Sequence, residues 1–174
     1  NRAETKIEAE GSHILLLADT AYFEGGNSSF GKLTSRAYKN GFTSNDTFGI
    51  LTVEAGSENW IFDTISIKEH LFINDTITAF TQFRGYPHGV IHNLSVNDIC
   101  LENVNIFNVD AVSGPYSGIN YYGLGSDTIS CTGWDSTLTP CYMNIGGVVR
   151  SDSSNPLSNG LVVLFKLNLN SSAM

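Results

Sequence analysis

Four histidines are the residues of this chain that could bind a metal ion or transfer a proton: His13, His70, His88 and His92. His88 and His92 stand four residues apart in the stretch PHGVIH. This stretch has the composition of a β-strand, and residues four apart on a strand are separated by about 13 Å. The pair therefore does not predict a shared metal ion, and the histidines are expected to be surface or hydrogen-bonded residues.

Sequence motifs of catalysis are absent from the chain. It contains no GxSxG elbow, no HExxH, no P-loop and no EF-hand loop. Two carboxylates from distant strands could still act together, because sequence spacing does not report on such pairs. Without a motif, we expect a protein that is not an enzyme and that needs no cofactor.

Calcium is the one ion that the sequence leaves open. Four aspartates fall in expected loops, where carboxylate and carbonyl oxygens could ligate Ca²⁺: Asp110, Asp127, Asp135 and Asp152. Turn and capping roles explain the same residues equally well.

Aromatic residues gather in one glycine-rich stretch, GPYSGINYYGLGSDTISCTGW. They are Tyr116, Tyr121, Tyr122 and Trp134. Aromatic rings offer flat apolar faces to sugars, and binding residues are often carried by loops. A glycan site is one interpretation, and rings that cover the end of the core are the other.

Charge and hydropathy exclude two classes of partner. The net charge is −8, from 9 Lys and Arg against 17 Asp and Glu, and no basic cluster occurs. Attraction to nucleic-acid phosphates or anionic lipids therefore has no source. No apolar run reaches the 18 or so residues that a membrane-spanning helix needs. Charged residues make up only 15 % of the chain, so uncharged polar residues must cover much of its surface.

Cysteines and glycosylation sequons favour a secreted or cell-surface protein. Cys131 and Cys141 bracket the loop in CTGWDSTLTPC, which predicts a disulfide between them, whereas a cytosolic protein with inert cysteines is the alternative. Five asparagines stand in Asn-x-Ser/Thr sequons: Asn27, Asn45, Asn74, Asn93 and Asn170. Chance alone would give about three such sequons, so the placement of several in turn-like stretches carries the argument.

The elements that must position these residues are all predicted to be strands. β-Branched and aromatic residues recur in short runs separated by Gly, Pro, Asn and Asp. The chain is therefore predicted to be all-β, with residues 12–174 forming one β-sandwich domain of the jelly-roll or immunoglobulin-like type. A parallel β-helix is the competing architecture, because NLSVNDICLENVNIFN is similar to one of its turns. The absence of further copies at a fixed spacing favours the sandwich.

The first 11 residues are predicted to be an extended segment distinct from that domain. Ala3, Thr5, Ile7 and Ala9 alternate with charged residues, which places them on one face of a strand. Such a strand could pair within its own sheet, form the helical remnant of a stalk, or add to a second copy of the chain across the flexible Gly11-Ser12 joint. Head-to-tail addition would build an open filament.

Four features are relevant together: the leading strand AETKIEAE, the all-β body, the scattered sequons and the strong last strand GLVVLFKLNLN. In these features the chain resembles the donor-strand-complemented filament subunits of prokaryotic surfaces, especially archaeal threads and bundling pili. The resemblance covers the whole chain in general character and includes no diagnostic motif. It implies a secreted, glycosylated, non-catalytic subunit whose residues 3, 5, 7 and 9 fill a groove in the next copy. Self-assembly into an extracellular filament is therefore the predicted function, and a lectin-like or fibre-head adhesion domain is the alternative.

Overall fold

The computed structural model describes residues 8–74, 80–123 and 125–136. The chain divides into two compact units, residues 1–141 and 142–174, and every described residue belongs to the first. The described residues form strands and turns without a helix. The strands are β1 Glu8–Leu16, β2 Thr20–Phe23, β3 Ser29–Ser35, β4 Lys39–Phe42, β5 Asp46–Glu54, β6 Glu58–Ile61, β7 Thr64–Asn74, β8 Thr81–Asn93, β9 Ile99–Leu101, β10 Val104–Ser113, β11 Asn120–Tyr122, β12 Asp127–Ile129 and β13 Asp135–Ser136.

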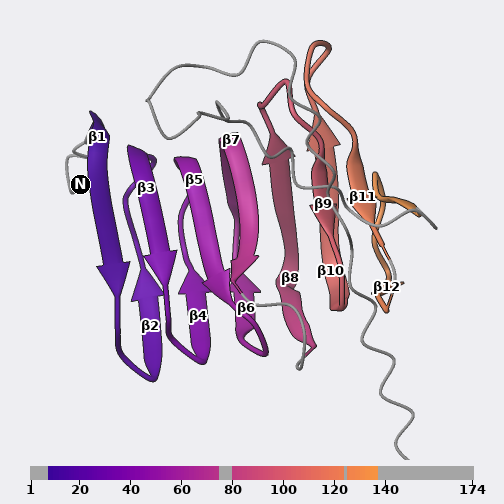
Figure 1. Cartoon of the computed structure of the whole chain (residues 1–174), viewed down its shortest axis with the longest axis horizontal. Helices are drawn as coiled ribbons and strands as arrows, with labels where there is room; N and C mark the ends of the chain where they lie inside the picture. The colour runs from indigo at the N-terminus through magenta and orange to yellow at the C-terminus, as the bar shows by residue number, and fades with distance from the viewer. Residues whose placement is uncertain (1–7, 75–79, 124, 137–174) are drawn as a thin grey trace, which may run out of the picture. The chain divides into compact units, whose positions relative to one another are not determined.

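All strand pairs within the described ranges are parallel. The chain winds through about six turns of a parallel β-solenoid, and each turn lays its strands beside those of the previous turn. Figure 1 shows β1, β3, β5 and β7 side by side in this arrangement. All-β was thus the correct class.

The predicted sandwich, jelly-roll or immunoglobulin-like architecture is wrong. A sandwich is built from antiparallel strands, whereas neighbouring strands here come from successive turns and run the same way. The sequence shows no fixed repeat because the length of a turn varies. Register partners are 18 residues apart for Leu33 and Leu51, 19 for Phe42 and Ile61, and 26 for Ile65 and Ile91.

Three strand faces surround the core of the solenoid. The first face contains β1, β3, β5, β7 and the second halves of β8 and β10. The second face contains β2, β4, β6, the first halves of β8 and β10, and β12. The third face is the short sheet of β9, β11 and β13.

Strand β8 passes around the corner between the second and first faces. Arg84 is in register with Phe107 of β10, and Gly89 is in register with Val109. Four residues of β8, 85–88, therefore stand opposite the single residue Asn108 of β10. The excess of three residues leaves the sheet as a bulge at the corner, so the strands on either side keep their alignment.

Inward side chains stack into columns because register partners in parallel strands repeat the same position in every turn. Two such columns are Phe30, Phe48 and Ile67, and Leu33, Leu51 and Leu71. All six residues are buried. The rings of Phe23, Phe30, Phe42 and Phe48 pack together with centroid distances of 5.1 to 6.1 Å. These columns make the continuous apolar core of the solenoid.

Two asparagines of the second face point into the solenoid and stack on each other. Asn40 and Asn59 are in register and almost completely buried. The Asn40 Nδ2 donates to Asn59 Oδ1 at 3.0 Å, and the Asn59 Nδ2 donates to the Ser57 hydroxyl at 3.0 Å and the Gln82 carbonyl at 3.1 Å. Buried amides are tolerated only when hydrogen-bonded, and here each turn supplies the partner for the next.

Strand β1 pairs in parallel with β3 of the same chain. Glu8 is opposite Ser29 and Ala9 is opposite Phe30. The boundary expected at residue 11 lies inside this strand, and the register shifts between Ala9 and His13, around Gly11. Ala3, Thr5 and Ile7 lie outside the described residues, as does the predicted last strand at 160–170.

Candidate functional site

The second face carries a column of large outward side chains. Inward residues such as Asn59, Phe83 and Ile106 are buried, so the residues that follow them point to the opposite side of the pleat. Register aligns these outward positions from β2 to β12 as Tyr22, Gly41, Trp60, Arg84, Phe107 and Ile129.

Arg84 sits between two aromatic rings of this column. Its Cζ lies 5.7 Å from the centroid of the Trp60 ring and 4.8 Å from that of the Phe107 ring. Both distances are in the range of cation–π attraction. Gln82 fixes the guanidinium, because its Oε1 accepts from Nε at 2.9 Å and from Nη2 at 2.5 Å. Trp60, Arg84 and Phe107 therefore form one stacked unit across three turns.

Gly41 is the gap in the column, and Tyr22 covers it. A Cβ built on Gly41 would lie 2.4 Å from Tyr22 Cδ1, so the tyrosine ring occupies the space where a side chain would stand. Tyr22 nevertheless remains 71 % exposed. The ring thus continues the column while keeping most of its surface in solvent.

Two further rings extend the column toward the corner. Phe62 and Tyr86 follow Trp60 and Arg84 by two residues, and their ring centroids are 6.0 Å apart in an edge-to-face arrangement. Tyr86 is 63 % exposed. We call the resulting surface the aromatic face, and its members are Tyr22, Trp60, Phe62, Arg84, Tyr86 and Phe107.

A polar column runs beside the aromatic face, two residues earlier on each strand. Its members are Thr20, Lys39, Glu58, Gln82, Asn105 and Asp127. Lys39 and Glu58 form an ion pair, with 3.9 Å between Nζ and Oε2. Flat rings beside a row of hydrogen-bonding groups can bind a ligand that has both apolar faces and hydroxyl edges.

The aromatic residues predicted as a glycan site do not come together on one surface. Tyr122 and Trp134 pack against the core. The Trp134 Nε1 donates to the Val109 carbonyl at 2.9 Å. Tyr121 is next to Tyr122 on β11 and so points to the other side of the strand. Tyr116 is 89 % exposed in the turn that precedes β11.

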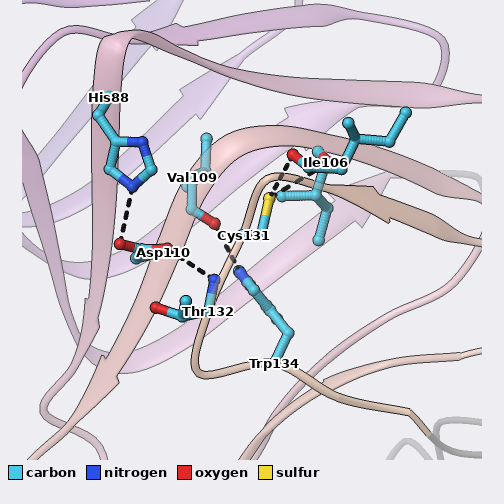
Figure 2. Close-up of polar contacts among 8 residues, drawn as sticks. His88, Ile106, Val109, Asp110, Cys131, Thr132 and Trp134 are labelled. Atoms are coloured by element: carbon cyan, nitrogen blue, oxygen red, sulfur yellow. Dashed lines mark hydrogen bonds and ion pairs between the residues drawn. The ribbon is translucent and has the colours of Figure 1, made fainter.

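A hydrogen-bonded cluster joins the corner bulge to the last described turn (Figure 2). His88 Nε2 lies 2.7 Å from Asp110 Oδ2, and the Thr132 amide donates to Asp110 Oδ1 at 2.6 Å. Partial burial raises the pKa of Asp110, but the hydrogen bonds from His88 and Thr132 outweigh it and leave that pKa below its ordinary value. The cluster ties neighbouring turns together. His92, by contrast, lies on the first face in register with Ser66.

The aspartates considered for calcium are spread over separate elements. Asp110 is engaged by His88, Asp127 begins β12 and Asp135 begins β13. Asp152 lies outside the described residues. In the part of the chain that the structure describes, no group of three or more His, Cys, Asp and Glu side chains could hold a metal ion.

The predicted Cys131–Cys141 disulfide is wrong, because Cys131 carries a free thiol. Its Sγ lies 3.4 Å from the Ile106 carbonyl oxygen and 3.1 Å from that of Ile129, and the side chain packs against the core (Figure 2). Sequence spacing predicted a disulfide across the loop, but the Cys131 side chain packs against the core instead. Cys141 lies outside the described residues.

The sequon asparagines differ in accessibility. Three are exposed: Asn27, Asn45 and Asn74. Asn93 is completely buried, and its Nδ2 donates to the carbonyls of Asn97 and Gly118. That amide is closed to modification in the folded chain. Asn170 lies outside the described residues.

No family model, curated protein or solved structure matches the chain. The described ranges also contain no helix with the length and apolarity to cross a membrane.

The residues of the aromatic face were missed by sequence reasoning. Trp60, Arg84 and Phe107 are 24 and 23 residues apart, and no two of them belong to one motif. The signal that could have found them is a large residue placed between two inward positions of a short strand. It becomes visible only when the register of the turns is known.

Proposed function

We propose that this chain is a glycan-binding domain of an extracellular or cell-surface protein, with the aromatic face as its binding surface. The observation that carries the proposal is the outward column from Tyr22 to Phe107 on successive turns, in which Tyr22 covers the position of Gly41. Tyr22 and Tyr86 are mostly exposed, and Trp60 and Phe107 are half-buried. Aromatic side chains gathered in this way on one surface are typical of interaction sites. The low content of charged residues and the exposed sequons support an extracellular location.

The proposed activity is binding without catalysis or a cofactor. Aromatic rings stack on the apolar faces of sugars, and the adjacent polar column supplies donors and acceptors for hydroxyl groups. Filament assembly by strand donation has less support as a function. The described residues form a solenoid and not a sandwich with an acceptor groove, and Ala9 of the expected donor strand has a partner in its own chain.

A binding screen with matched variants tests the proposal. The full chain is applied to immobilised glycans, and Tyr86→Ala is compared with Tyr116→Ala, which also removes a highly exposed tyrosine. We expect Tyr86→Ala to weaken binding about tenfold, the equivalent of about 1.4 kcal/mol. Tyr116→Ala should bind as the parent does. Equal binding by all three proteins, or loss only with Tyr116→Ala, would reject the aromatic face as the site.

A further inference from the structure

We propose that the ligand of the aromatic face is an extended, uncharged polysaccharide chain that lies across the strands and contacts several turns of the solenoid at once. This inference rests on the proposed function and specifies its substrate class. It concerns the direction, the length and the charge of the bound chain, and each follows from a separate feature of the second face.

The direction follows from the register. Tyr22, Trp60, Arg84 and Phe107 occupy equivalent positions on different strands, so a line through them crosses the strands. A ligand that follows one strand would meet one of these side chains. A ligand that crosses the strands would meet all of them.

The length follows from the strand spacing. Tyr22 on β2 and Phe107 on β10 are separated by four strand steps, through β4, β6 and β8. Neighbouring strands are about 4.8 Å apart, so the part of the column from Tyr22 to Phe107 extends over about 19 Å. A single sugar ring cannot reach both ends of such a column. Full occupancy therefore needs a chain of several units.

The continuity of the column supports one extended ligand over several separate ones. Tyr22 covers the position of Gly41, and Arg84 fills the space between Trp60 and Phe107. Large side chains thus cover each step between the two ends, so a ligand that crosses the strands meets one continuous surface. An isolated sugar site would need only one ring and its hydrogen-bonding partners.

The absence of charge on the ligand follows from the balance of positive and negative side chains in the outward aromatic column and the polar column beside it. They carry two basic residues, Lys39 and Arg84, and two acidic residues, Glu58 and Asp127. Lys39 is paired with Glu58, and the whole chain has a net charge of −8. A polymer with a negative group on each sugar would be repelled by the chain and by Glu58 and Asp127. A polycation would be attracted by the net charge of the chain but would meet the positive guanidinium of Arg84 at the centre of the column.

The test compares polysaccharides of different charge and oligosaccharides of different length. Calorimetry with the full chain uses neutral xylan, mannan, hydroxyethyl-cellulose and soluble β-1,3-glucan, with polygalacturonate and chitosan as the charged counterparts. Purified oligosaccharides of one to eight units from the tightest-binding polymer then provide a length series. We expect a neutral polymer to bind tightest, and its affinity to rise at least tenfold with length before levelling off once the chain spans the column.

Tyr22→Ala, at one end of the column, should lower affinity for the longest oligosaccharide at least fivefold and leave that for the shortest one bound unchanged. Tyr116→Ala is the matched control and should follow the parent throughout. Affinity that is independent of length, or tightest for a charged polymer, would overturn this inference and leave the proposed function in place. Binding to none of these polymers, together with no binding in the glycan screen, would overturn both.

Discussion

The stacked asparagines inside the solenoid give a sharp test of its register. Asn40 and Asn59 meet only if β4 and β6 are adjacent and parallel with Lys39 opposite Glu58. Replacing Asn59 by Ala removes its three side-chain hydrogen bonds, to Asn40, Ser57 and the Gln82 carbonyl. Each contributes about 0.5–1.5 kcal/mol net. The expected loss in the free energy of unfolding is therefore about 3 kcal/mol.

Urea unfolding followed by circular dichroism at 25 °C measures this loss. With an m value of about 2 kcal/mol/M, the midpoint should fall by about 1.5 M urea. The matched control is Asn105→Ala, on the same face in the outward polar column, whose side chain makes no hydrogen bond within the described ranges. A surface change of this kind should alter stability by no more than about 0.5 kcal/mol.

A double-mutant cycle with Asn40→Ala separates the contact from the general cost of each change. Residues that share a hydrogen bond couple by about 0.5–3 kcal/mol, and Asn40 and Asn59 should fall in this range. Additive single effects, or an Asn59→Ala cost no larger than that of Asn105→Ala, would refute the register and with it the alignment of the aromatic face.

Two further predictions concern the corner between the second and first faces. Gly85→Ala should destabilise the fold by about 1–3 kcal/mol, because the added Cβ would lie 1.9 Å from the Asn108 carbonyl oxygen. The control is Gly11→Ala, whose Cβ would meet nothing within 4 Å and which should leave the melting temperature unchanged or slightly higher. The lowered pKa of Asp110 means that this carboxylate binds fewer protons in the folded state than in the unfolded state. Asp110 therefore stabilises the fold above about pH 4, and this contribution is lost as the pH falls below that value. Melting curves between pH 2 and 6 should therefore show a steeper acid loss for the parent than for Asp110→Asn, and parallel curves would contradict the assignment.

The strand content of the fold could be predicted from the sequence, but the pairing of the strands could not. Alternation in runs such as VNIF predicts that alternate residues are buried, and Val104 and Ile106 are indeed buried. The same alternation suits a sandwich or a solenoid. The two folds differ in which strands are neighbours. Insertions at the corners vary the spacing of register partners from 18 to 26 residues, so the sequence shows no fixed repeat.

The candidate site was beyond sequence reasoning for a related reason. The stretch 116–134 was predicted to bind glycans because its aromatic residues are close in sequence, yet the Trp134 Nε1 donates to the Val109 carbonyl and the side chain packs against the core. Trp60, Arg84 and Phe107 are distant in sequence and become neighbours only through parallel pairing. Proximity in the chain was therefore a poor guide to proximity on the surface.

The corner bulge of β8 also bears on how such a protein can change over evolutionary time. Residues 85–88 stand opposite one residue of β10, yet Val109 to Ser113 of β10 remain aligned with Gly89 to Asn93. Insertions at a corner are thus absorbed without moving any column. A single insertion within a strand would instead turn every following inward side chain to the surface. Descendants of this sequence should vary in length at their corners and be almost invariant in length along their strands.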